Sequence, residues 1–137
     1  ATGGGLNHRM GLYDQALIKD NHLRILRKES IASIVLRLKA SVLKRTIIGV
    51  EVKNLLELKE AFKTPADYIL LDNMPVEMVR EAVNLRSRTQ SKILFEASGG
   101  ITIDNVLAYA QTGVERISVG ALTHDAPSVD VSLDIVG

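Results

Sequence analysis

The chain has 137 residues, of which 46% are hydrophobic and 24% charged, and its formal net charge is +1. This length and composition suit one globular domain, residues 1–137, with a core large enough to stabilise it. The small net charge gives no general reason to expect nucleic acid or a membrane as a partner. The absence of cysteine excludes disulfides, zinc–thiolate sites and cysteine nucleophiles.

Apolar stretches and the N-terminal residues indicate where the protein is located and whether the sequence is complete. No apolar stretch approaches the roughly 18 residues that a membrane helix needs, and no signal peptide is visible, so the cytoplasm is the expected location. The chain opens with ATGGGLNHR, which lacks an initiator methionine and has three glycines typical of a loop. We therefore expect upstream sequence to be missing.

Taken in chain order, the pattern predicts strands that alternate with helices. LIKDNH (17–22) carries an apolar segment into four polar residues. The following segment, 22–45, is predicted to be helical, because apolar residues recur at helical spacing in Ile31, Ile34, Val35, Leu38 and Val42. TIIGVEV (46–52) is β-branched and nearly continuous, as in a buried strand.

The alternation continues through the middle of the chain. Asn54, with Glu57 three residues later, predicts the cap of a second helix, whose inner face would carry Leu55, Leu58 and Phe62. DYILLDN (67–73) is predicted to be a strand, and Pro75 to be the first residue of a third helix.

The C-terminal part repeats the pattern. KILFEAS (92–98) predicts a strand, and a helix is expected from about Thr102 to Gln111, with Gly113 as its stop. RISVG (116–120) and VDVSLDI (129–135) predict two further strands. Strands joined by helices must run parallel, so the predicted fold class is α/β. Strand starts lie about 20 to 30 residues apart, which favours an incomplete (β/α) barrel over an open sheet.

Polar residues gather at the carboxyl ends of the predicted strands, where parallel α/β folds build their active sites. These ends and the loops after them contain Lys19, Asp20, Asn21, Glu51, Asp72, Asn73, Glu96, Ser98, Gly99, Gly100, Gly120, Thr123 and His124. We expect these residues to surround one cavity.

The residue types at this rim predict a phosphorylated, metal-bound substrate. Glu51 and Asp72 suit Mg²⁺, a hard cation that takes oxygen ligands and often bridges to substrate phosphates. SGG (98–100) and SVG (118–120) each precede a helix or loop, where backbone N–H groups bind phosphate.

Each motif also has a simpler explanation. SGG alone can be a turn, and Glu51 can be an edge residue or one half of an ion pair. The basic residues of the predicted first helix are most simply a solvated helix face. RNA binding is less favoured, because aromatic residues make up only 4% of the chain. These basic residues are Arg24, Arg27, Lys28, Arg37, Lys39, Lys44 and Arg45. The functional interpretation rests on the convergence of the motifs on one rim.

Six motifs in order resemble the quinolinate phosphoribosyltransferase family, over nearly the whole chain. They are GGGLNHR (3–9), LIKDNH (17–22), VEV (50–52), ILLDNM (69–74), EASGGIT (96–102) and SVGALTH (118–124). The resemblance implies transfer of phosphoribosyl from phosphoribosyl pyrophosphate to quinolinate with decarboxylation. The products would be nicotinate mononucleotide, CO₂ and pyrophosphate, in the synthesis of NAD. It also implies a Mg²⁺ requirement, a homodimer or larger homo-oligomer, and a catalytic barrel that follows an N-terminal α/β sandwich domain.

The resemblance assigns roles by position. Quinolinate, a dianion, would be bound by the cations His8, Arg9 and Lys19. Glu51 and Asp72 would face the ribose and the Mg²⁺–pyrophosphate, and with Lys19 they are the expected catalytic residues. The 5′-phosphate would be bound by Ser98, Gly99, Gly100 and Gly120, with His124 nearby.

Two departures from the family keep alternatives open. The sequence does not contain the family's upstream Thr-Arg-Lys motif or its sandwich domain, so we expect part of the acceptor site to lie outside it. The alternatives are a paralogous barrel phosphoribosyltransferase with another acceptor, a non-catalytic barrel fragment, and a generic phosphate-binding barrel of amino-acid metabolism. LIKDNH together with NHR favours the quinolinate enzyme, because these residues supply the cations that a dicarboxylate needs.

Overall fold

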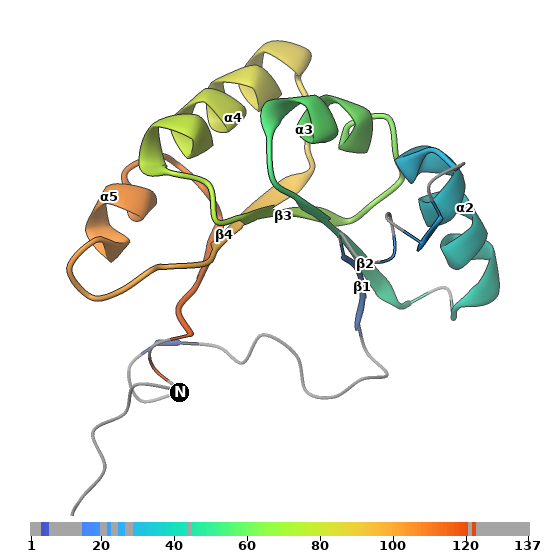
Figure 1. Ribbon diagram of the computed structural model, residues 1–137, viewed down its shortest axis with the longest axis horizontal. Coiled ribbons are helices and arrows are strands. Elements are labelled where there is room, and N and C mark those ends of the chain that lie inside the picture. Colours follow the sequence, from blue (N-terminus) through green and yellow to red (C-terminus); the bar gives the residue numbers. More distant parts are fainter. Residues whose placement is uncertain are drawn as a thin grey trace, which may run out of the picture.

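A computed structural model shows a curved sheet with its helices on the convex side (Figure 1). The structure describes residues 4–5, 15–19, 22, 25–26, 29–43, 45–120 and 122. The elements are β1 (Gln15–Ile18), α2 (Ile31–Ser41), β2 (Ile47–Val52), α3 (Leu55–Ala61), β3 (Tyr68–Asp72), α4 (Val76–Thr89), β4 (Leu94–Ser98), α5 (Val106–Ala110) and β5 (Arg116–Ser118). None of these helices is long and apolar enough to cross a membrane.

The sheet has the topology of a barrel wall. Its five described strands lie in the order β1-β2-β3-β4-β5, and each neighbouring pair is parallel. An open doubly wound sheet would reverse the strand order and carry helices on both faces. Sequential order with helices on one side is instead the arrangement of a (β/α) barrel. The predicted α/β class is therefore confirmed, and the strand expected at 129–135 lies outside the described residues.

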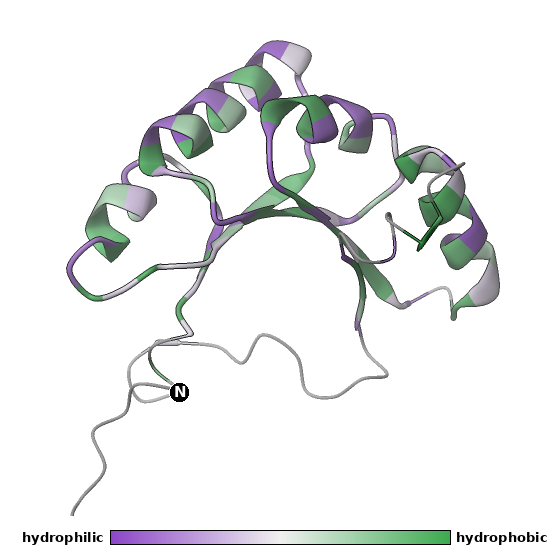
Figure 2. Cartoon of the chain, in the orientation of Figure 1, coloured by the Kyte–Doolittle hydropathy of each residue, from purple (hydrophilic) through white to green (hydrophobic). Residues whose placement is uncertain are grey.

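The outer face of the sheet forms the hydrophobic core with the helices. Alternate strand residues point to this face, and the helices pack their own apolar residues against them. Figure 2 shows hydrophobic residues along the strands and alternating with hydrophilic ones on the helices. Fully buried members of this core include Ile48, Val50, Val52, Ile69, Leu71 and Phe95 from the strands, and Val35, Leu58 and Val79 from the helices. Each such aliphatic side chain contributes about 1.5–3 kcal/mol relative to an exposed one.

Side-chain caps set where the first helices begin. The Ser30 hydroxyl accepts a hydrogen bond from the Ser33 N–H at 3.2 Å, so α2 begins at Ile31. The helical segment predicted at 22–45 was therefore too long. The predicted cap of α3 is confirmed, because Asn54 Oδ1 accepts from the N–H groups of Leu56 and Glu57 at 3.0 and 2.9 Å.

Two later helix starts correct the prediction. Pro75 has an extended backbone, with ψ 154°, and is the N-cap of α4 rather than its first helical residue. The helix predicted from Thr102 begins only at Val106, since the Asn105 side chain holds the preceding turn. Its Nδ2 donates to the Gly100 carbonyl at 3.0 Å, and its Oδ1 accepts from the Thr102 N–H at 2.8 Å.

An ion pair ties α4 to the amino ends of β4 and β5. Arg86 donates to Glu115 Oε2 at 2.5 Å, and the Phe95 N–H donates to the same oxygen at 2.8 Å. Burial acts to raise the pKa of Glu115. The hydrogen bonds from Arg86 and Phe95 and the charge of Arg86 together outweigh burial, so the pKa is lowered below its usual 4.5.

Candidate active site

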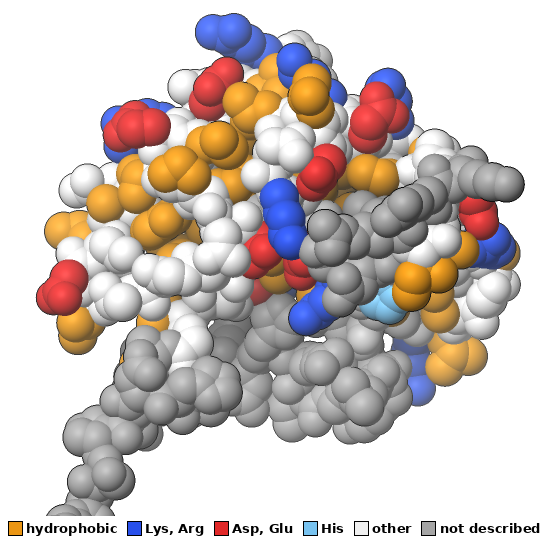
Figure 3. Space-filling view, in the orientation of Figure 1, with side chains coloured by type: hydrophobic (Ala, Val, Ile, Leu, Met, Phe, Trp, Pro, Cys, Tyr) orange, Lys and Arg blue, Asp and Glu red, His pale blue; other side chains and the backbone are white. Residues whose placement is uncertain are grey.

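A polar cavity lies at the carboxyl ends of the strands, on the face of the sheet opposite the core. Its volume is about 480 Å³, and it is lined by Leu17, Lys19, His22, Glu51, Leu70, Asp72, Ser98, Ser118 and Gly120. Acidic and basic side chains lie next to one another near the centre of the molecule (Figure 3). Five residues predicted for the site therefore share one cavity: Lys19, Glu51, Asp72, Ser98 and Gly120.

Strand register explains why these residues meet. Glu51 is opposite Leu70, and Asp72 lies two residues further along β3 on the same face. The usual strand spacing and rise then place the Cα atoms of Glu51 and Asp72 about 8 Å apart. Asp72 is opposite Ser98, and Ser98 is opposite Ser118. The cavity wall thus carries two carboxylates followed by two hydroxyls.

Glu51 and Asp72 offer oxygen ligands of the kind that Mg²⁺ takes. The Glu51 side chain is buried at the cavity wall, and Asp72 is half-buried. Within the described residues, no group of three or more His, Cys, Asp or Glu side chains could hold a metal ion. Two carboxylates on one wall suffice for Mg²⁺, which commonly keeps several waters and takes its remaining ligands from substrate phosphates.

Lys19, the residue after β1, adds a cation to the same cavity, and its backbone is hydrogen-bonded to His22. The Lys19 N–H donates to His22 Nδ1 at 3.0 Å, and the His22 N–H donates to the Lys19 carbonyl at 2.9 Å. Both residues line the cavity. His22 was not among the predicted site residues, although it closes the motif LIKDNH. The local signal was its spacing of three from Lys19.

The Ser98–Gly100 loop has a backbone that suits glycine. Gly99 and Gly100 have φ values of 90° and 61°, in the left-handed region that residues with a Cβ rarely adopt. The Asn105 side chain fixes the end of this loop through the Gly100 carbonyl. The loop is thus held in place before any ligand binds.

Ser118 is a lining residue whose hydroxyl is oriented by a buried carboxylate. Its Oγ donates to Glu96 Oε1 at 2.6 Å, and Glu96 is 2% exposed. A serine has one O–H donor and two acceptor positions, so a hydroxyl that donates to Glu96 presents acceptor positions to the cavity. Sequence patterns placed Glu96 at the rim but could not predict this pair, because the two residues are 22 apart.

Below the cavity, toward the amino ends of the strands, side chains are tightly packed on the same face of the sheet. Gln15 Nε2 donates to the Tyr68 hydroxyl. Tyr68 lies across Gly49, where an added Cβ would be only 2.2 Å from the ring. The Arg116 guanidinium is 5.8 Å from the centroid of the same ring. This packing leaves room for no side chain at residue 49.

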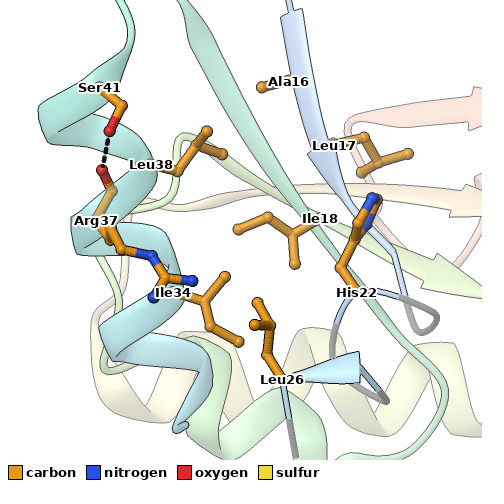
Figure 4. A pocket seen from close by; sticks show the side chains of 9 residues that line it. All are labelled: Ala16, Leu17, Ile18, His22, Leu26, Ile34, Arg37, Leu38 and Ser41. Carbon is orange, nitrogen blue, oxygen red and sulfur yellow. Dashed lines mark hydrogen bonds between the residues drawn. The ribbon is translucent and has the colours of Figure 1, made fainter.

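A second cavity of about 470 Å³ lies between β1 and α2 (Figure 4). Its lining is mainly aliphatic, and its charged residue Arg37 donates to Glu29 at 2.8 Å. None of the predicted site residues is among its lining residues. The polar cavity is therefore the candidate active site.

Three predicted site residues cannot be placed. His8, Arg9 and His124 lie outside the described residues, as do Asp20, Asn21 and Thr123 at the predicted rim.

Comparison with known proteins decides the family. The family model of the quinolinate phosphoribosyl transferase C-terminal domain matches residues 1–134. The chain belongs to this family. The resemblance inferred from the six motifs is thus confirmed for this quinolinate phosphoribosyl transferase domain.

Individual relatives agree with this result. The domain is 46% identical over 138 residues to the probable nicotinate-nucleotide pyrophosphorylase (carboxylating) of Methanocaldococcus jannaschii, a match that covers 98% of this chain and 48% of that protein. It superimposes on the nicotinate-nucleotide pyrophosphorylase of Francisella tularensis with a TM-score of 0.78 at 42% identity, over 88% of this chain and 41% of that one. For NadC from Streptococcus pyogenes the TM-score is 0.81 at 32% identity, over 93% of this chain and 43% of that one. The chain spans about half the length of the curated relatives it matches.

Proposed function

We propose that this domain carries the phosphoribosyl-transfer site of a nicotinate-nucleotide pyrophosphorylase (carboxylating). The reaction joins quinolinate to phosphoribosyl pyrophosphate and releases pyrophosphate and CO₂, leaving nicotinate mononucleotide. The observation that supports this most is the shared cavity of Lys19, Glu51, Asp72, Ser98 and Gly120. The names of the relatives support the choice of acceptor.

Cationic side chains bind the acceptor in this proposal. Quinolinate carries two carboxylates, and Lys19 lies at the cavity edge where it can neutralise one of them. His8 and Arg9 are proposed to bind the second carboxylate, by their place in the motif NHR. This arrangement holds the pyridine nitrogen toward the ribose.

The two carboxylates act on the donor substrate. Glu51 and Asp72 would hold Mg²⁺, which when bound would supply positive charge to neutralise the pyrophosphate leaving group. The negative charge of Glu51 and Asp72 also stabilises the positive charge that develops at the anomeric carbon. Positioning and electrostatics therefore supply most of the rate enhancement, and acid–base catalysis by the protein is not required for this step.

The glycine loops bind the 5′-phosphate. Ser98, which lines the cavity, and the following Gly99 and Gly100 would supply hydroxyl and backbone donors, and Gly120 lies in the cavity lining two residues beyond β5. His124 is proposed to lie near this phosphate. These contacts fix the ribose while its anomeric carbon is attacked.

The bond changes balance without an external oxidant or reductant. The ring nitrogen forms a bond to the anomeric carbon as the bond from that carbon to pyrophosphate breaks. The carbon–carbon bond to the carboxylate beside the nitrogen then breaks and releases CO₂. The resulting carbanion is stabilised by the adjacent pyridinium nitrogen and takes a proton from water.

A homodimer or larger homo-oligomer and a cytoplasmic location remain predictions.

Product detection tests the proposal directly. The chain is incubated with Mg²⁺, phosphoribosyl pyrophosphate and either quinolinate or nicotinate, and nicotinate mononucleotide is sought by mass spectrometry. We expect nicotinate mononucleotide when the acceptor is quinolinate, and none when it is nicotinate. Product from nicotinate but not quinolinate would favour a paralogous enzyme with another acceptor. A folded chain that binds neither quinolinate nor phosphoribosyl pyrophosphate in calorimetry would refute the proposal for this chain.

A further inference from the structure

Asn73, which directly follows the cavity residue Asp72, has an unusual backbone. Its φ of 51° is left-handed, a conformation shared by only one other non-glycine residue of the described chain, Gln90. Asparagine tolerates this region better than most residues with a Cβ. The Asn73 N–H donates to the Ser98 carbonyl at 2.8 Å, just beyond the paired residues Asp72 and Ser98. The turn therefore keeps β3 and β4 joined past the end of their strands.

The Asn73 side chain contacts a proposed catalytic carboxylate. Its Nδ2 donates to Asp72 Oδ1 at 3.1 Å. A carboxylate at the end of a strand otherwise rotates about its side-chain torsions. A bond from a neutral amide to one oxygen restricts that rotation and leaves acceptor positions for a cation or a substrate hydroxyl.

The same amide packs against the glycine loop. A Cβ built on Gly99 would lie 2.5 Å from both Cγ and Oδ1 of Asn73, and 2.8 Å from Nδ2. The Asn73 amide thus occupies the space that any side chain at residue 99 would need. No comparable neighbour exists at Gly100, where a Cβ would meet nothing within 4 Å.

We propose that Asn73 is a positioning residue that sets the Asp72 carboxylate relative to the Ser98–Gly100 loop. A sugar that carries a 5′-phosphate and a metal-bound pyrophosphate must contact the Asp72 carboxylate and the Ser98–Gly100 loop at the same time. The distance between these two protein groups therefore selects for that substrate. This inference rests on the proposed function and deepens it. Quinolinate would be held by Lys19, which follows β1, a strand separated from β3 by β2, and so depends less on Asn73.

The central test replaces Asn73 with glycine, which keeps the left-handed backbone and removes the amide. Gln90→Gly is the matched control, because Gln90 has a φ of 54° at the end of α4 and neither chain neighbour lines the cavity, whereas Asn73 directly follows the lining residue Asp72. Calorimetry with Mg²⁺ and phosphoribosyl pyrophosphate should show binding weakened about tenfold in Asn73→Gly. The control should bind within about twofold of the parent. Both variants should keep or raise the Tm.

Selectivity between the two substrates separates positioning from a general structural role. Binding of quinolinate to Asn73→Gly should stay within about twofold of the parent. Equal weakening of both substrates with a fall in Tm, or unchanged binding of phosphoribosyl pyrophosphate, would overturn the assignment.

A ligand-free cycle tests the contact with the loop independently of the proposed function. Gly99→Ala and Gly100→Ala each place a Cβ at a left-handed position, but only the first meets Asn73. The Tm should fall further in Gly99→Ala, and Asn73→Gly should recover that excess. If the parent does not bind phosphoribosyl pyrophosphate, the proposed function fails, and the cycle still decides whether Asn73 positions the loop. Equal falls in the two alanine variants would exclude it.

Discussion

The two faces of the sheet are built from alternate residues of the same strands, yet they have opposite chemistry. On β3, Ile69 and Leu71 are fully buried against the helices, while Leu70 and Asp72 line the polar cavity. On β4, Phe95 and Ala97 belong to the core, while Glu96 and Ser98 face the other side. Because neighbouring residues of a strand point to opposite faces, one segment serves stability and chemistry at once.

Because the two faces are distinct, stability and catalytic activity should be separable by mutation. A change on the outer face should alter the free energy of unfolding, and activity only through it. A change at the cavity should alter substrate binding or turnover at nearly constant stability. The four predictions below test this separation, from the largest expected effect to the smallest.

Phe95→Ala should give the largest loss of stability. Phe95 is fully buried, its ring centroid is 6.0 Å from that of Phe62, and the Arg86 guanidinium is 4.7 Å from its ring. Truncation should lower the free energy of unfolding by about 3–5 kcal/mol in urea titrations. The exposed Leu107 provides the control, since Leu107→Ala should cost less than about 0.5 kcal/mol. A cost below about 1 kcal/mol for Phe95→Ala would argue against a tightly packed outer face.

Asp72→Asn should lower turnover by about a hundredfold, because it removes a charge proposed to stabilise the transition state. The Tm should change little, since Asp72 is half-buried and lies at the end of its strand. Asp67→Asn is the matched control at the other end of β3. Asp67 Oδ2 accepts from the Ile48 N–H at 2.8 Å and Asp67 Oδ1 lies 3.9 Å from Lys39 Nζ, so loss of its charge should weaken both contacts and lower stability while turnover is kept. A large fall in Tm for Asp72→Asn would assign Asp72 a structural role instead.

Lys19→Ala should distinguish between the substrates. Quinolinate binding should weaken about tenfold, because one carboxylate loses its cation, while binding of phosphoribosyl pyrophosphate changes less. Calorimetry with each substrate measures the two effects. Lys39→Ala on α2 is the control, since Lys39 donates to the Pro65 carbonyl rather than lining the cavity. Equal weakening for both substrates would contradict the role given to Lys19.

Glu115→Gln should have the smallest effect, visible in the pH dependence of stability. The lowered pKa means that the folded state favours the charged carboxylate. Its contribution is therefore fully present above the unfolded pKa near 4.5, and is lost as the pH falls through the lower folded value. Melting temperatures between about pH 6 and pH 3 should fall less steeply in Glu115→Gln than in the parent. An identical slope in both proteins would show that Arg86 and Glu115 do not contribute to acid sensitivity.

The order of the elements was predictable because it depends on local patterns. Continuous β-branched runs predicted β2 at 46–52 within one residue of Ile47–Val52. The predicted helix starts were less accurate. Capping residues decide where a helix begins, and they lie outside the apolar residues that recur at helical spacing. Ser30 and Asn105 act through hydrogen bonds to nearby backbone groups that hydrophobic spacing does not record.

The candidate site was predictable to the extent that it follows from strand ends. Lys19, Glu51 and Asp72 were assigned to one rim because parallel strands all end on the same side of the sheet, and they do line one cavity. Glu96 and Ser118 could not be paired in advance. Their contact depends on the register of β4 and β5, which is decided across 22 residues of chain.

By itself, then, the sequence determined the α/β alternation, the parallel direction of the strands and the set of polar residues at their carboxyl ends. These follow from periodicity and from the short connections between elements. Only the tertiary structure decided which of those residues touch. The Asn73 amide against Asp72 and Gly99, and the Ser118 hydroxyl against Glu96, arise where separate strands are brought side by side. Such contacts depend on distances between segments, and no local pattern specifies those distances.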